Sequence, residues 1–137
     1  MPLAAIDHYF VYARDLEASR RFYEQVLGFE VGVRPPFPFK GYWLYLDGKA
    51  RVHLGEAESS PGQTDYLGEH DAREHGHTGS LDHVAFQASG FREFRAKLDA
   101  LGVEYRHREV PQFKLQQLFV KDPDGVTLEL NFPSEDG

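Results

Sequence analysis

The chain has 137 residues, no cysteine and a formal net charge of -7 at pH 7. This length suits one ordinary domain, the lack of cysteine excludes disulfides, thiolate metal sites and cysteine nucleophiles, and the acidic balance argues against a surface that binds nucleic acid. No apolar run approaches the ~20 residues of a membrane span and no signal-peptide pattern stands at the N-terminus, so we expect a cytoplasmic protein that does not bind membranes.

The first half of the chain opens with the pattern of a strand followed by a helix. Residues 6–12 are β-branched and aromatic, which favours a strand, and Asp15 is suited to cap a helix. Apolar residues then recur at helical spacing as far as Leu27, and Gly28 is placed to end the helix.

Three strands are predicted after this helix. Residues 29–33 have an extended pattern and lead into a loop rich in proline. Asp47-Gly48 is the strongest short hairpin signal in the chain, and it joins strands predicted at residues 42–46 and 49–54. The first half therefore predicts the order strand, helix and three strands.

The second half repeats this order. Its helix is predicted at residues 91–101, before Gly102, from apolar residues at helical spacing. Its strands are predicted at residues 81–87, 103–105, 115–121 and 126–132. Between the halves lies a polar stretch without periodicity, which predicts a linker.

The repeat extends to single residues that can bind a metal. The tripeptide Leu81-Asp82-His83 repeats the motif of Ile6-Asp7-His8. The predicted strand that carries Glu129 corresponds to the predicted strand that carries His53. A duplicated unit with nitrogen and oxygen ligands at matched places indicates one central metal. The candidate ligands are His8, His53, His83 and Glu129.

Strand alternation predicts which side chains line a cavity beside these ligands. Glu129 and His53 each lie on one face of their own strand. The opposite face of each strand carries aliphatic residues that suit packing on a helix. The loop at residues 35–43 is aromatic and could overhang the cavity or pack in the core. Arg51 and Gln117 could contact a polar or anionic substrate group. The candidate substrate-binding residues are Phe37, Phe39, Trp43, Tyr45, Arg51, Gln117 and Phe119.

The arrangement resembles the vicinal oxygen chelate superfamily, which includes glyoxalase I, methylmalonyl-CoA epimerase, extradiol dioxygenases, fosfomycin-resistance thiol transferases and bleomycin-binding proteins. The resemblance covers nearly the whole chain and is carried by four stretches. These are Ile6-Asp7-His8, Phe22-Tyr23-Glu24-Gln25-Val26-Leu27-Gly28-Phe29, Leu81-Asp82-His83-Val84-Ala85-Phe86 and the stretch from Asp122-Pro123-Asp124-Gly125 to Val126-Thr127-Leu128-Glu129-Leu130.

The resemblance implies an α+β fold in which two tandem βαβββ modules form a cup-shaped mixed sheet around a metal site. Residues 1–137 would form one domain, with module one at about 4–56, a linker at about 57–79 and module two at about 80–132. Family members place ligands on the first and last strand of each module, which here are the four candidates above. Glyoxalases often carry a carboxylate where His53 stands, and this sequence departs from them there. His53 could also donate a hydrogen bond to a metal ligand, or be a hydrogen-bonded histidine of the pocket wall.

Imidazole and carboxylate ligands suit one divalent ion of Fe, Mn, Ni, Co or Zn and leave positions open for substrate oxygens. Bound to two oxygens, such an ion acts as a Lewis acid. We expect a glyoxalase-type isomerase or lyase acting on a small molecule, and a homodimer, as is common in the family. The alternatives are an extradiol-type dioxygenase with a 2-His-1-carboxylate site and a metal-free antibiotic-binding resistance protein. The catalytic base is unassigned; Glu56, Tyr45 and Gln117 are possible.

Overall fold

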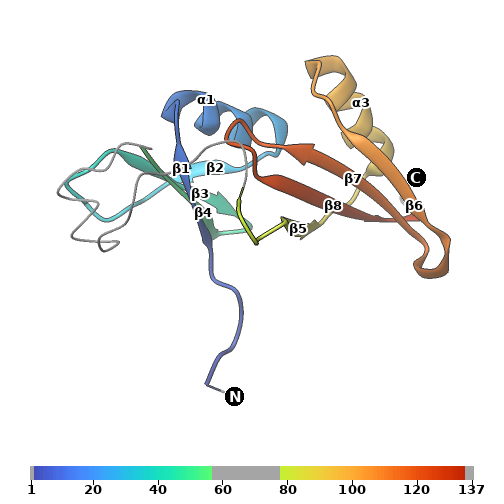
Figure 1. Cartoon of the computed structure of the whole chain (residues 1–137), viewed down its shortest axis with the longest axis horizontal. Coiled ribbons are helices and arrows are strands. Elements are labelled where there is room, and N and C mark those ends of the chain that lie inside the picture. The colour runs from blue at the N-terminus through green and yellow to red at the C-terminus, as the bar shows by residue number, and fades with distance from the viewer. Residues whose placement is uncertain (1, 57–77, 135–137) are drawn as a thin grey trace. The chain divides into compact units, whose positions relative to one another are not determined.

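The structure is a computed structural model, and it describes residues 2–56 and 78–134 (Figure 1). The chain divides into two compact units, Met1–His75 and Gly76–Gly137, which are described separately below. Within the described residues, each unit contains a mixed sheet of four strands together with helical segments. The predicted α+β fold with two βαβββ modules is therefore confirmed. The predicted linker and its histidines, His70, His75 and His77, lie outside the described residues.

The first unit follows the predicted order. Its elements are β1 (Tyr9–Ala13), α1 (Leu16–Arg21), a π-helical segment (Phe22–Val26), β2 (Glu30–Gly32), β3 (Gly41–Leu46) and β4 (Lys49–Glu56). The strand order is β1-β4-β3-β2, with β1 parallel to β4 and the other pairs antiparallel. The predicted hairpin joins β3 to β4, and Asp47 and Gly48 both have positive φ angles, of 53° and 77°, as a type I′ turn requires.

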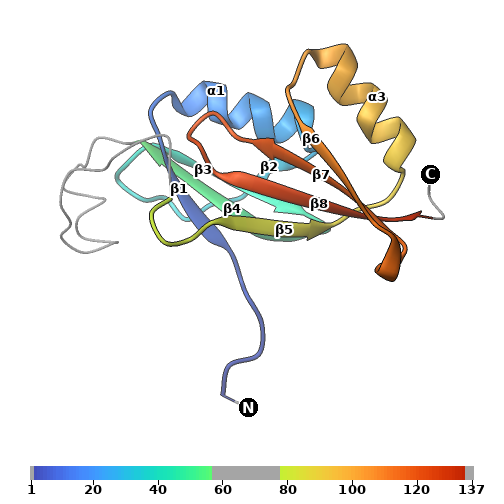
Figure 2. The same ribbon diagram turned by 45° about the vertical axis from the view of Figure 1, so that its right-hand side comes forward.

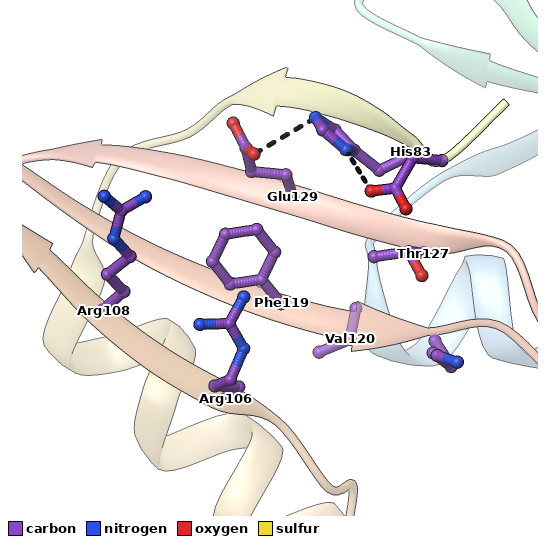
Figure 3. A pocket seen from close by; sticks show the side chains of 9 residues that line it. His83, Arg106, Arg108, Phe119, Val120, Thr127 and Glu129 are labelled. Carbon is purple, nitrogen blue, oxygen red and sulfur yellow. Dashed lines mark hydrogen bonds and ion pairs between the residues drawn. The ribbon is translucent and has the colours of Figure 1, made fainter.

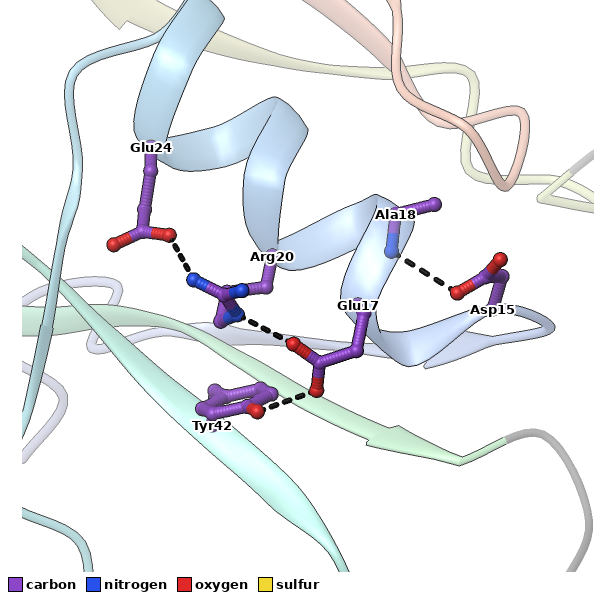
Figure 4. A network of polar contacts seen from close by, with 6 residues as sticks. All are labelled: Asp15, Glu17, Ala18, Arg20, Glu24 and Tyr42. Carbon is purple, nitrogen blue, oxygen red and sulfur yellow. Dashed lines mark hydrogen bonds and ion pairs between the residues drawn. The ribbon is translucent and has the colours of Figure 1, made fainter.

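Helix α1 begins and is held on the sheet by side chains that the sequence supplies locally. The Asp15 carboxylate accepts a hydrogen bond of 3.0 Å from the Ala18 backbone N–H, which confirms the predicted cap (Figure 4). Glu17 accepts a bond of 2.8 Å from Arg20 and one of 2.5 Å from the Tyr42 hydroxyl on β3. The carboxylate of Glu17 thus ties the first turn of α1 to the sheet.

The second unit repeats the topology of the first. Its elements are β5 (His83–Gln87), α3 (Phe91–Leu101), β6 (Arg106–Val110), a 3-10 turn (Pro111–Phe113), β7 (Leu115–Lys121) and β8 (Thr127–Pro133). The strand order is β5-β8-β7-β6, with β5 parallel to β8 (Figure 2). In both units, therefore, the first strand of the module pairs in parallel with its last strand, as the repeat in the sequence indicates.

One predicted strand lies at a different place. Residues 103–105 are extended by pattern, but the strand β6 starts at Arg106. The residues before it complete the end of α3: the Val103 N–H donates to the Leu98 carbonyl at 3.0 Å, and the Tyr105 hydroxyl donates to Asp99 at 2.9 Å. The first of these bonds satisfies a carbonyl at the end of the helix, and both bonds keep residues 103–105 against α3.

Alternation along β8 gives this unit its two faces. Leu128, Leu130 and Phe132 are buried on the side of α3, where the rings of Phe91 and Phe94 lie 5.6 and 5.7 Å from that of Phe132. The residues between them, including Glu129, are only half-buried and face away from the helix. The predicted alternation of buried and half-buried side chains along β8 is thus present. The face of the sheet that points away from α3 is polar. No helix in the described residues is long and apolar enough to cross a membrane.

Candidate metal and substrate site

Each module brings its own two candidate ligands close together, and the strand register is the same in both modules. In the first unit Phe10 of β1 pairs with His53 of β4, and in the second Ala85 of β5 pairs with Glu129 of β8. Phe10 follows His8 by two residues, and Ala85 likewise follows His83. Because residues two apart share a strand face, each histidine lies on the same face as the ligand candidate of the neighbouring strand.

The pair in the first unit is a stack of imidazole rings. The ring of His53 lies 3.7 Å from that of His8 and 4.1 Å from that of Trp43, with 12° between the planes in each case. Two rings at such distances can only occupy opposite faces of His53, so His53 is enclosed between them. Only 3% of its surface is exposed.

The enclosed ring of His53 has one nitrogen without a partner. Its Nε2 lies 3.2 Å from the Ala50 carbonyl, which can only accept, so Nε2–H is the donor and the lone pair is on Nδ1. Nδ1 is the one buried side-chain nitrogen or oxygen in the described residues that has no hydrogen-bond partner. Burial of the ring and, to a smaller extent, the nearby His8 lower the pKa of His53 to about 4. The imidazole of His53 is therefore neutral near pH 7.

The pair in the second unit joins an imidazole to a carboxylate. His83 Nε2 lies 3.3 Å from Glu129 Oε1 (Figure 3). The Asn131 amide donates a bond of 2.9 Å to Glu129 Oε2. The hydrogen bond to Asp82, and next the charge of Glu129, raises the pKa of His83. Both residues line a pocket of about 490 Å³ on the polar face of the sheet.

The preceding aspartate orients the histidine in both units. His8 Nδ1 lies 2.7 Å from Asp7 Oδ2, and His83 Nδ1 lies 2.8 Å from Asp82 Oδ2. A carboxylate accepts, so each Nδ1–H is the donor and Nε2 carries the lone pair of the neutral ring. A carboxylate that fixes the tautomer and orientation of a histidine in this way is a common feature of metal sites.

The second pair fits a shared divalent ion better than the first. Ligand atoms about 2.0–2.2 Å from one ion lie roughly 3 Å apart, which the 3.3 Å between His83 and Glu129 approaches. The stacked rings of His8 and His53 keep their lone pairs in nearly parallel planes, so one ring must turn before both can reach one ion. In the described residues no three His, Asp or Glu side chains form a group that could hold a metal. Each unit by itself supplies two candidates.

The aromatic residues predicted to line the cavity in the first unit divide into two places. Trp43 stacks on His53, and Phe37 lies 6.4 Å from Trp43 and 5.4 Å from Phe39 between ring centroids. Phe37 and Phe39 stack on each other, but the ring of Phe37 is tilted by 49° from that of Trp43. Tyr45 lies elsewhere: a bulge between Leu44 and Tyr45 shifts the register, and Tyr45 lines another pocket, beside β2.

The polar candidates of the first unit have structural contacts. Arg51 donates bonds of 3.0 and 2.8 Å to the carbonyls of Ile6 and Asp7, which fastens the segment that carries His8. Tyr45, a possible proton donor or acceptor, gives its hydroxyl proton to the Val33 carbonyl at 2.6 Å. Glu56 is exposed at the end of β4.

In the second unit, Gln117 and Phe119 lie on the sheet face that carries Glu129. Phe119 lines the pocket of His83 and pairs directly with Glu129 across the strands. Gln117 is buried and donates a bond of 2.9 Å to the Asn131 side chain. His107, to which the sequence assigns no role, lies on β6 and contacts Gln116 at 2.6 Å.

Two residues of this pocket, Arg106 and Arg108, are not among the sequence candidates. They lie on β6, and the misplaced strand at residues 103–105 hid their alternation. The signal available in the sequence is the pattern Arg106-His107-Arg108, which puts both arginines on one face once the strand begins at Arg106.

Comparison with known proteins identifies the family. The sequence profile of the Glyoxalase/Bleomycin resistance protein/Dioxygenase superfamily matches residues 5–130. The chain belongs to this superfamily. The resemblance to vicinal oxygen chelate proteins inferred from the repeated motifs is therefore confirmed. Among curated relatives of this superfamily member, Glyoxylase I 4 from Arabidopsis thaliana is 31% identical over 135 residues, which cover 93% of this chain and 70% of the plant protein.

Solved structures agree with the fold of the superfamily. Lactoylglutathione lyase from Agrobacterium tumefaciens has 21% sequence identity and a TM-score of 0.70, over 100% of this chain and 99% of that chain. The fosfomycin resistance protein FosX from Listeria monocytogenes has 20% identity and a TM-score of 0.68, over 95% of this chain and 93% of that chain. At these identities the likeness concerns the fold alone.

Proposed function

We propose that the chain is a metal-dependent glyoxalase-type isomerase or lyase that acts on a small substrate through two of its oxygens. The proposed ligand set of the divalent ion is His8, His53, His83 and Glu129. The observation that carries the proposal is the 3.3 Å approach of His83 Nε2 to Glu129 Oε1, with Asp82 holding the other ring nitrogen. The likeness to Glyoxylase I 4 at 31% identity supports the reaction class.

The residues of the chain have distinct parts in this proposal. When bound, the ion would act as a Lewis acid on the two substrate oxygens and stabilise the negative charge that develops beside them. Asp7 and Asp82 orient the histidines, while Asn131 presents Glu129. Trp43 and Phe119 offer apolar surface beside the two pairs. Isomerisation requires proton transfer next to a carbonyl, for which a positioned base is needed.

The first experiment is elemental analysis of protein purified without a histidine tag, with Glu129→Gln as the matched control. About one Fe, Mn, Ni, Co or Zn ion per chain is expected in the wild-type protein and much less in the variant. Isomerase activity is then assayed on hemithioacetals with the wild-type protein after metal removal and readdition. Activity that needs no metal, or equal metal content in both proteins, would overturn the proposal.

A second candidate function is supported by the composition of the ligand set. Two histidines and one carboxylate are the set of non-haem iron oxygenases, and His83 and Glu129 would need one further histidine to form it. Oxygen uptake with catechols tests this extradiol-type reaction. Uptake without isomerase activity would favour the dioxygenase. Tight binding of an antibiotic by protein that takes up no metal would favour a resistance protein instead.

We also propose that the working unit is a homodimer, because family members commonly pair modules of two chains around each site. Mixing inactive His8→Ala and Glu129→Ala variants tests this. If the modules pair across chains, one site of the mixed dimer has a complete ligand set and activity returns. No recovery, although subunit exchange is demonstrated, would indicate that each site is formed within one chain.

A further inference from the structure

The guanidinium of Arg106 lies over an aromatic ring of the pocket in the second unit. The central carbon of the guanidinium lies 4.3 Å from the centroid of the Phe119 ring. Both side chains lie on the sheet face that carries Glu129 (Figure 3). Within the described residues Arg106 has no hydrogen bond to a side chain and no ion pair with a carboxylate. Stacking uses the face of a guanidinium and leaves the N–H groups at its edge available.

Arg108 is the second cation of this pocket, and a chain of amide side chains positions it. Its Nη1 donates to Gln117 Oε1 at 3.3 Å, Gln117 donates to Asn131 Oδ1 at 2.9 Å, and Asn131 donates to Glu129 Oε2 at 2.9 Å. Because a guanidinium can only donate and a carboxylate can only accept, the two ends fix the direction of every bond between them. Arg108 is thus connected to the candidate ligand Glu129.

The strand pairing puts these residues in two adjacent rows. Arg106 pairs with Phe119, and Phe119 with Glu129; in the next row Arg108 pairs with Gln117, and Gln117 with Asn131. The arginines therefore lie on the edge strand β6, and Phe119 of β7 lies between Arg106 and Glu129 of β8 in the same pocket.

The charge of the pocket is opposite to that of the chain. Three cations, Arg106, Arg108 and Lys121, line it together with two carboxylates, Asp82 and Glu129, whereas the chain has a net charge of -7. Both carboxylates contact His83: Asp82 accepts a hydrogen bond from Nδ1, and Glu129 lies beside Nε2. The two arginines and Lys121 are therefore the groups of this pocket available to an anion from solution, and of these only the arginines have planar donors.

We propose that Arg106 and Arg108 form a subsite for an oxyanion of the substrate, a carboxylate or a phosphoryl group. The planar guanidinium donors match the oxygens of either group, and Phe119 offers apolar surface to the adjoining carbon. The identification of this anion with part of the substrate rests on the proposed function. The substrate class is then a small anionic molecule whose other oxygens reach the metal ligands.

Inorganic phosphate and acetate serve as probes of the subsite in metal-free protein. Their binding is followed through the side-chain Nε–Hε NMR signals of the arginines, with sodium chloride as the reference salt. Saturable shifts of the Arg106 and Arg108 signals are expected, with at least one probe bound more tightly than chloride. Arg106→Ala or Arg108→Ala should weaken that binding about tenfold. Tighter binding of phosphate favours a phosphoryl group, and tighter binding of acetate favours a carboxylate.

The matched control is Arg92→Ala, which removes an exposed arginine of α3 outside the pocket and should leave binding unchanged. Arg106→Lys keeps the charge but loses the planar donors, so it should bind more weakly than the wild-type protein. Backbone NMR spectra establish that each variant is folded. Shifts that do not saturate, or equal effects of the Arg92 and Arg106 variants, would overturn the subsite and indicate only general attraction of anions.

A parallel titration with Mn²⁺ separates this proposal from the proposed function. Metal binding by protein that fails to bind either anion would overturn the subsite and leave the metal-dependent enzyme standing. Anion binding by protein that takes up no metal would do the reverse. For the substrate itself, the arginine variants should raise KM more than they lower kcat, because the oxyanion is bound in both the ground state and the transition state.

Discussion

The two modules share one topology and one register, yet their candidate ligand pairs differ in character. The imidazole rings of His8 and His53 form a stack, and Trp43 covers the other face of His53. His83 and Glu129 form a polar pair that faces an open pocket with cationic side chains. The two modules thus place their candidate ligands at corresponding positions, while the surroundings of each pair differ.

The difference indicates a division of labour between the modules. In the proposed site, the second module would supply the anionic ligand, Glu129, and the polar groups for a charged substrate. The first module would supply imidazole nitrogen and aromatic surface. Burial lowers the pKa of His53, whereas Asp82 and Glu129 raise the pKa of His83, so protonation of His53 disfavours folding and protonation of His83 favours it.

The largest effect on metal affinity is expected from removing Glu129, the proposed anionic ligand. Glu129→Ala should weaken Mn²⁺ binding at least about 100-fold, because changing even an outer-shell partner costs up to that amount. Isothermal titration calorimetry of metal-free protein measures the affinity. His53→Ala should weaken binding less, since it removes a neutral ligand whose ring must turn to bind. Wild-type affinity in the Glu129 variant would remove this residue from the ligand set.

The second effect is a loss of stability in acid that originates in the first module. In metal-free protein His53 has a pKa of about 4, below the ~6.5 of an unfolded histidine, so its contribution is present above pH 6.5 and is lost as the pH falls toward 4. Relative to His53→Gln, the wild-type free energy of unfolding should fall by about 3 kcal/mol between pH 7 and pH 4. Urea unfolding at both pH values measures the change.

His83 should show the opposite sign. Because its folded pKa is raised, its contribution is complete below the unfolded pKa and is lost as the pH rises through the folded value. Histidine NMR signals distinguish the two residues directly. Trp43 is the only tryptophan of the chain and stacks on His53, so its fluorescence offers a second readout of His53 protonation. Titration of both histidines at one pH would contradict the contrast between the modules.

The third effect tests a feature that the modules share. Asp7→Ala and Asp82→Ala should each weaken Mn²⁺ binding roughly 10- to 100-fold, because the histidine loses the carboxylate that orients it. Asp7→Asn and Asp82→Asn retain an acceptor oxygen and should lose less. Exposed Glu93 on α3 gives the matched control, Glu93→Gln. If only one aspartate matters, the two histidines are not equivalent ligands.

The sequence was sufficient for those features that depend on local rules. The Asp15 cap, the Asp47-Gly48 hairpin and the alternation of β8 each follow from a single residue type or a period of two, and all three are present. The repeated Asp-His dipeptide also gave the register in which His83 approaches Glu129.

The sequence was insufficient where tertiary contacts shift a strand. Residues 103–105 have strand-like side chains, but the end of α3 uses the Val103 N–H and the Tyr105 hydroxyl. Between Leu44 and Tyr45 the pairing skips one residue of β4, Arg51, and periodicity alone does not reveal this bulge. The enclosure of His53 between two rings depends on three strands meeting, so no single segment predicts it.

The smallest effects concern the turns before the last strand of each module. In the first module, Gly48 has a φ of 77° and a methyl group added to it would meet no atom within 4 Å. In the second, the buried Asp122 carboxylate accepts bonds of 2.9 Å from the backbone N–H groups of Asp124 and Val126. One turn thus depends on backbone conformation and the other on a side chain.

Gly48→Ala should therefore lower the free energy of unfolding by about 1 kcal/mol, the cost of a left-handed conformation for alanine. Asp122→Ala should cost about 2 kcal/mol, because it leaves buried donors without an acceptor. Urea unfolding at pH 7 measures both. Asp122→Asn retains an acceptor oxygen and should recover part of the loss. A larger cost for Gly48→Ala than for Asp122→Ala would show that backbone strain, and not the buried carboxylate, limits how these two modules tolerate change.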